Sequence, residues 1–111
     1  MNASIFPVDL KKYMGTWQQI SVEPVPSFQK GCKDVKAIYS LRKDGKVDVL
    51  NVCDNRSVKG IAKSVSDDNR RLKVSFFPLI WAEYDIAEID ENYKNVTVKS
   101  RKYTWKLKKI S

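Results

Sequence analysis

Residues 9–17 read DLKKYMGTW, and this stretch near the N-terminus decides how the rest of the chain is interpreted. Asp9 is a favourable N-cap, because its side chain can accept hydrogen bonds from the unpaired N–H groups of a first helical turn. Gly15 permits a tight turn after that helix, and Trp17 is the first large apolar side chain of the strand that follows. The stretch therefore predicts a short helical turn that leads into a β-strand carrying a buried tryptophan.

Composition indicates one folded domain and removes several kinds of chemistry. The chain has 111 residues, of which 42% are hydrophobic, so we expect a single domain over residues 1–111. It has no histidine, which removes histidine-based catalysis and histidine ligation of a metal, and its two cysteines cannot form a zinc site alone. We therefore expect no metal and no cofactor. No apolar run is long enough to span a bilayer, and the N-terminus lacks the features of a signal peptide.

The rest of the chain alternates short apolar and polar runs with turn residues, which is typical of antiparallel β-structure. The clearest hairpin turns at Asp44-Gly45, because glycine tolerates the positive φ of such a turn. Gly60 indicates a bulge or a close backbone contact, and Pro78 predicts an apolar loop over residues 77–81. The eight predicted strands cover residues 16–22, 35–41, 47–51, 58–65, 72–76, 83–89, 93–98 and 103–107. They predict an all-β protein, either an up-and-down barrel or a sandwich.

Three segments, taken in order, resemble the lipocalin family and within it the bacterial and apolipoprotein-D-like branch. The first is YMGTW at residues 13–17, and the second runs from Phe28 through the hairpin to Cys53. The third comprises LKVSFF at 72–77, DENY at 90–93 and SRKYTWKL at 100–107. The resemblance implies an eight-stranded up-and-down antiparallel β-barrel with a short N-terminal helical turn. In that barrel Gly15 and Trp17 belong to the closed end.

Two features of the chain depart from the family pattern. Where the family has an arginine shortly after the tryptophan of the last strand, this chain has Lys109, which can lie over the Trp17 ring as a cation without the planar stacking of a guanidinium. The family also continues with a helix against the outside of the barrel, whereas this sequence ends at Ser111. We therefore expect a barrel face that is either more polar than usual or used for homo-oligomerisation.

Cys32 and Cys53 match cysteines of the same branch, and both lie near the far ends of the two hairpin strands. Residues paired across antiparallel strands are close enough for a disulfide. The alternative is a pair of buried free thiols in a cytosolic protein. A disulfide implies a secreted, periplasmic or otherwise extracytoplasmic location, with or without association with a membrane.

The side chains that face inward by strand alternation are mostly apolar with a few hydroxyls, which suits an elongated amphiphile such as a fatty acid or a lysophospholipid. A solid core without a cavity is the alternative. At the predicted mouth, apolar and basic side chains meet, which fits an anionic head group or the surface of an anionic membrane. The candidate ligand-binding residues are Phe28, Tyr39, Val49, Val74, Phe76, Trp81, Tyr84, Arg101 and Tyr103.

We therefore expect non-catalytic binding and transport of a small hydrophobic, anionic amphiphile. The alternative is a basic all-β module, with a net charge of +8, that binds a polyanion or nucleic acid on its surface. Against that alternative, the aromatic residues mostly fall on the inward face of the predicted strands. Catalysis is not expected, because the sequence offers no pairing of a nucleophile with a base, and we assign no catalytic residue.

Overall fold

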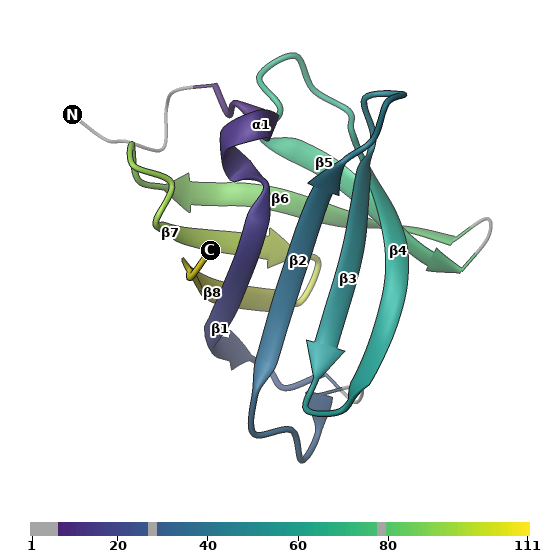
Figure 1. Ribbon diagram of the computed structural model, residues 1–111, viewed down its shortest axis with the longest axis vertical. Helices are drawn as coiled ribbons and strands as arrows, with labels where there is room; N and C mark the ends of the chain where they lie inside the picture. Colours follow the sequence, from purple (N-terminus) through teal and green to yellow (C-terminus); the bar gives the residue numbers. More distant parts are fainter. Residues whose placement is uncertain (1–6, 27–28, 78–79) are drawn as a thin grey trace.

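The chain folds into a closed antiparallel barrel in which each strand pairs with the next and β8 pairs with β1 (Figure 1). The structure is a computed structural model that describes residues 7–26, 29–77 and 80–111, with residues 77 and 80 described for their backbone only. The elements are α1 Leu10–Tyr13, β1 Gly15–Glu23, β2 Val35–Leu41, β3 Val47–Cys53, β4 Arg56–Ser64, β5 Arg71–Phe77, β6 Ile80–Ile89, β7 Asn95–Ser100 and β8 Tyr103–Lys109. The predicted eight-stranded up-and-down antiparallel barrel with a short N-terminal helical turn is confirmed.

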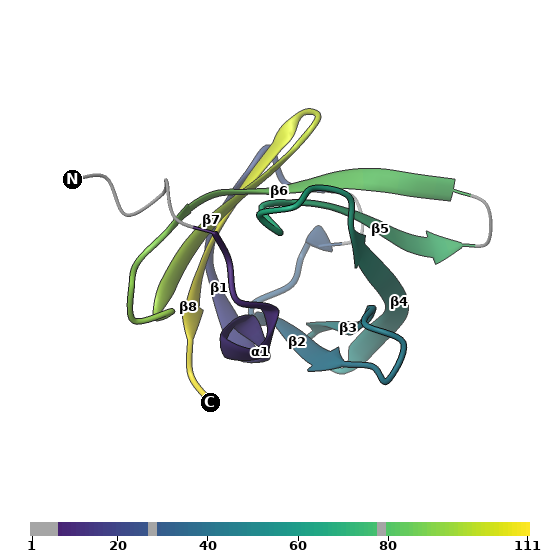
Figure 2. The same ribbon diagram turned by 90° about the horizontal axis from the view of Figure 1, so that it is seen from above.

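The α1–β1 junction forms as residues 9–17 predict. The Asp9 side chain accepts a hydrogen bond from the backbone N–H of Lys11, at 2.9 Å, and so caps α1. Gly15 has a φ of 133°, and a Cβ atom there would lie 2.4 Å from the carbonyl oxygen of Ser111, so only glycine fits. Seen from above, α1 lies at this end of the barrel beside β1 and β2 (Figure 2).

The core fills the end of the barrel that α1 covers. Because successive strands run in opposite directions, the first residues of the odd-numbered strands and the last residues of the even-numbered strands lie at this same end of the barrel. Buried apolar side chains gather there from every strand, and Trp17 is 0% exposed. The core comprises Val8, Tyr13, Trp17, Ala37, Tyr39, Val47, Val49, Ala62, Leu72, Ile86, Ile89, Tyr93, Val96, Val98 and Leu107.

Lys109, the last residue of β8, covers Trp17, as the resemblance to lipocalins implies. Its Nζ lies 5.7 Å from the centroid of the Trp17 ring and donates a hydrogen bond to the carbonyl oxygen of Lys12. The register of the closing strands explains the contact, because Trp17 and Lys109 are partners in the β1–β8 ladder. Partial burial, with a smaller contribution from the charge of Lys94, lowers the pKa of Lys109.

Several predicted strand boundaries were wrong. The predicted loop over residues 77–81 is instead strand at both ends, since β5 runs to Phe77 and β6 begins at Ile80, its register partner. Apolar and aromatic residue types favour strands, which accounts for the strand at residues 77, 80 and 81, whereas Pro78 lies outside the described residues. β7 begins at Asn95 and not at Tyr93, because Tyr93 has a φ of 55° and belongs to the preceding turn.

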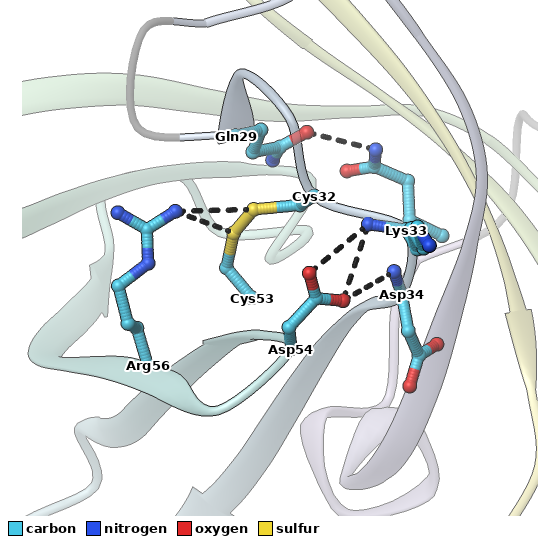
Figure 3. The surroundings of a disulfide bond; sticks show 8 residues. Gln29, Cys32, Lys33, Asp34, Cys53, Asp54 and Arg56 are labelled. Atoms are coloured by element: carbon cyan, nitrogen blue, oxygen red, sulfur yellow. Dashed lines mark hydrogen bonds between the residues drawn. A yellow bond between two sulfur atoms is a disulfide. The ribbon is translucent and has the colours of Figure 1, made fainter.

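A disulfide joins Cys32 to Cys53, with Cα atoms 5.7 Å apart. The predicted bond is confirmed, and the free-thiol alternative is excluded. Its placement differs from the prediction, because Cys53 pairs with Val35 in the ladder and Cys32 precedes β2 in a loop. The disulfide therefore ties the β1–β2 loop to the end of β3 (Figure 3).

In the part of the chain that the structure describes, no helix has the length and apolar character needed to cross a membrane.

Candidate ligand cavity

A cavity of about 230 Å³ lies inside the barrel, on the side away from α1. Among the described residues its walls are mostly apolar and come from every strand except β4, with Gln29 added from the β1–β2 loop. The barrel is therefore not filled by a solid core. The lining residues are Gln19, Gln29, Val35, Lys36, Ala37, Tyr39, Val49, Asn51, Val74, Phe76, Ala82, Glu83, Tyr84, Val98, Ser100, Tyr103, Trp105 and Leu107.

The last residues of β1, β3, β5 and β7 lie at the same end of the barrel, as an up-and-down topology requires. The β1–β2 loop is held there by two sets of contacts beside the disulfide (Figure 3). The Asp54 carboxylate accepts hydrogen bonds from the backbone N–H groups of Lys33 and Asp34, at 3.1 and 2.8 Å. Arg56 Nη2 donates to both sulfur atoms, at 3.5 Å for Cys32 and 3.4 Å for Cys53.

The structure brings most of the predicted ligand-binding residues together. The cavity lining includes Tyr39, Val49, Val74, Phe76, Tyr84 and Tyr103. Trp81 and Arg101 are exposed and do not belong to the lining, and Lys63 Nζ lies 4.4 Å from the centroid of the Trp81 ring. Phe28 lies outside the described residues. The part that each of these side chains takes in binding stays a prediction.

The sequence reasoning missed several polar lining residues. Asn51 follows Val49 at an interval of two, so the alternation of β3 could have identified it. Lys36 gave no such signal, because it alternates with the inward-facing Val35 and Ala37. Lys36 Nζ bonds the carboxylate of Asp34, and Gln18 Nε2 donates to the same carboxylate at 2.7 Å. The hydrogen bond from Lys36, followed by that from Gln18, lowers the pKa of Asp34.

Three tyrosine hydroxyls meet between the core and the cavity. Tyr84 is hydrogen-bonded to Tyr13, with 2.6 Å between the hydroxyl oxygens, and also to Tyr39. Burial raises the pKa of Tyr13 and Tyr84 well above the ordinary 10.0 and that of Tyr39 to about 12. The three hydroxyls therefore remain protonated throughout the physiological range of pH. They form a neutral polar cluster in apolar surroundings.

The close contact predicted at Gly60 is present, and it leads to a test of stability. A Cβ atom on Gly60 would lie 2.7 Å from both Phe76 Cδ1 and the carbonyl oxygen of Ser75. We expect Gly60→Ala to lower the free energy of unfolding by about 1 to 3 kcal/mol through overpacking. Urea unfolding measures this change. The sign of the change in free energy separates the two cases, because at an unhindered strand position alanine would instead raise the free energy of unfolding by about 0.5 to 1 kcal/mol over glycine.

The arrangement defines a class of protein, a β-barrel that is packed at one end and holds a small apolar cavity toward the other. Among the described residues, no group of acidic or cysteine side chains is placed to hold a metal ion. The chain belongs to the lipocalin family, since the sequence model of the lipocalin-like domain matches residues 8–110. Lipocalins are generally non-enzymatic proteins that bind and transport small hydrophobic ligands.

Individual relatives agree with this assignment. The chain is 34% identical over 106 residues to the outer membrane lipoprotein Blc of Citrobacter freundii, covering 87% of this chain and 59% of Blc. It is 41% identical over 93 residues to mouse apolipoprotein D, covering 77% of this chain and 48% of apolipoprotein D. The chain thus spans about half to three fifths of the length of these relatives. The crystal structure of the cockroach allergen Per a 4 shares the fold, with a TM-score of 0.66 at 16% identity, covering 97% and 73% of the two chains.

Proposed function

We propose that this chain is a non-catalytic carrier that holds the hydrocarbon part of a small anionic amphiphile, such as a fatty acid or a lysophospholipid, inside the barrel. The observation that carries the proposal is the mostly apolar cavity, with Val74, Phe76 and Trp105 among its walls. Its volume of about 230 Å³ is below the usual range for drug-sized ligands, roughly 300 to 1,000 Å³. A ligand with a compact or medium-length chain therefore fits best.

The charge around the mouth supports an anionic outer end on the ligand. Exposed cationic side chains lie on the connections at that end and beside them, namely Lys30, Lys33, Arg56, Lys99, Arg101 and Lys102. Two acidic groups lie in the same region: Asp34 is paired with Lys36, whereas Asp54 keeps its charge while it accepts two backbone N–H groups, so the cations still outnumber these acids. The remaining positive charge attracts a carboxylate or phosphate.

We place the protein outside the cytoplasm. Disulfides such as Cys32–Cys53 form and persist in oxidising compartments. The relative from Citrobacter freundii is named as an outer membrane lipoprotein, which agrees with an extracytoplasmic site of action. The cationic mouth would also favour contact with an anionic membrane, from which a lipid could be taken up.

Displacement of a fluorescent fatty acid tests the carrier function. We expect the wild-type protein to bind the probe saturably at micromolar concentration, with decanoate displacing it more weakly as salt is added. Val74→Trp should fill the cavity and weaken probe binding at least tenfold. Val65→Trp is the matched control, because Val65 is 51% exposed and does not line the cavity. The affinity of this variant for the probe should equal that of the wild type.

The outcomes separate the carrier from its alternative. Absence of saturable binding by the folded wild-type protein, or equal binding by both valine variants, would contradict a ligand in the cavity. Displacement of the probe by decanol as readily as by decanoate, without dependence on salt, would contradict the anionic preference. Tight, salt-sensitive binding of a single-stranded oligonucleotide that leaves the probe in place would support surface binding of a polyanion.

A further inference from the structure

The tyrosine cluster formed by Tyr13, Tyr39 and Tyr84 has a hydrogen-bonding capacity that the fold alone does not use. The three residues come from α1, β2 and β6, so the cluster joins segments that lie far apart in the sequence. The rings of Tyr13 and Tyr39 are stacked, with centroids 5.2 Å apart, and the Tyr84 ring meets that of Tyr39 edge-on at 80°. Tyr39 and Tyr84 belong to the cavity lining, whereas Tyr13 does not.

The cluster lies at the inner end of the cavity. β2 enters the lining at Val35 and reaches Tyr39 four residues later, which corresponds to about 13 Å along a strand. Tyr39 pairs in the ladder with Gly15, the residue that begins β1 directly after α1 and its cap. A ligand that enters at the mouth therefore meets these hydroxyls with its leading end.

Counting hydroxyl protons shows what the cluster can offer. Each tyrosine hydroxyl carries one proton, and the two hydrogen bonds within the cluster, both to Tyr84, use two of the three. If the bonds run from Tyr13 to Tyr84 to Tyr39, the remaining proton is that of Tyr39. If Tyr13 and Tyr39 both donate to Tyr84, it is that of Tyr84. If they run the other way, from Tyr39 to Tyr84 to Tyr13, it is that of Tyr13, which does not line the cavity. In two of the three arrangements the remaining donor therefore belongs to a residue that lines the cavity, and a ligand oxygen at this point would favour those two.

The surroundings of the cluster favour an uncharged acceptor. Among the described lining residues, the charged side chains are Lys36 and Glu83, which have opposite signs, and Lys36 already bonds Asp34. Lys36 also follows Val35 directly, so it lies toward the mouth. A carboxylate at the inner end would be buried without a cation, which is costly, whereas a hydroxyl or carbonyl oxygen needs only the hydrogen bond.

We propose that Tyr39 and Tyr84 form a hydrogen-bonding subsite for a neutral oxygen, a hydroxyl or carbonyl group, on the inner end of the ligand. This inference rests on the proposed function of the cavity as a ligand site. Combined with a cationic mouth, it identifies the ligand class as a medium-length chain with an anionic group at one end and a neutral oxygen at the other. A hydroxy or oxo fatty acid has this chemistry.

The test compares two ligands that differ by one hydroxyl group, decanoate and ω-hydroxydecanoate, by displacement of a fluorescent fatty acid. We expect the wild-type protein to bind ω-hydroxydecanoate about fivefold more tightly, the usual net effect of one hydrogen bond. The double variant Tyr39→Phe, Tyr84→Phe removes both cluster hydroxyls that line the cavity and should reduce the ratio of the two affinities to one or below. Tyr103→Phe removes another hydroxyl from the lining, close to the mouth, and should change both affinities alike, so that the ratio persists.

A measurement on the wild-type protein alone keeps the proposal testable if the tyrosine variants fold poorly. Decanoate carrying its hydroxyl near the middle of the chain cannot reach the cluster and should bind no more tightly than decanoate itself. Equal affinity of the wild type for decanoate and ω-hydroxydecanoate, or a preference that survives the double substitution Tyr39→Phe, Tyr84→Phe in a folded variant, would overturn the subsite while leaving the carrier function intact. Failure of every probe to bind would instead contradict the carrier function.

Discussion

Replacement of Trp17 by alanine is expected to lower the free energy of unfolding by about 3 to 5 kcal/mol. The Trp17 side chain is 0% exposed and packs against Tyr13, with ring centroids 5.2 Å apart. Its Nε1 donates to the carbonyl oxygen of Tyr13 at 2.9 Å, which links the closed end of the barrel to α1. Alanine would leave a large void among β1, β8 and α1. Urea unfolding followed by far-ultraviolet circular dichroism measures the loss without depending on tryptophan fluorescence.

The matched control is Trp81→Ala, which removes the same side chain from a different environment. Trp81 is 39% exposed, and its contact with Lys63 is worth about 0.5 to 1 kcal/mol at an exposed site. Trp17→Ala should therefore shift the urea midpoint several times further than Trp81→Ala does. Similar shifts for the two variants would contradict the view that Trp17 anchors the packed end of the barrel.

The fold could be predicted from the sequence because its determinants are local. Alternating apolar residues define the strands, and Asp44-Gly45 defines the clearest turn, in which Gly45 adopts a φ of 86°. The cap at Asp9 and the conformation of Gly15 are equally local. The contact of Lys109 with Trp17 joins the two ends of the chain, and it was expected only through the resemblance to lipocalins.

The candidate site was harder to predict because it depends on register and on contacts across the barrel. A register shift between Gln19 and Ser21 interrupts the alternation of β1, so Ser21 is exposed although alternation places it on the face of Trp17. Tyr13 and Tyr84 are separated by 71 positions, and no spacing rule indicates that their hydroxyls meet. Strand alternation gives the face of a side chain, but it does not give its height in the barrel or its partner across the cavity.

Removal of the disulfide, by the double substitution Cys32→Ser and Cys53→Ala, is expected to cost about 3 kcal/mol of stability in the chain-entropy model, since the bond closes a loop between residues 21 positions apart. Binding should weaken as well. Gln29 lines the cavity from the loop that the disulfide holds, and it accepts a hydrogen bond from Gln19 Nε2 at 2.8 Å. Urea unfolding and probe displacement measure the two effects on the same variant.

Reduction of the wild-type protein supplies the control for this variant. The chain contains no other cysteine, so a reductant should bring the wild-type urea midpoint to that of the double variant and leave the variant itself unchanged. The contacts of Asp54 with the backbone of Lys33 and Asp34 do not need the disulfide, so the loop should stay partly ordered and binding should weaken without being lost. An unchanged midpoint in the double variant would mean that these polar contacts suffice to hold the loop, and it would contradict the stabilising role assigned to the disulfide.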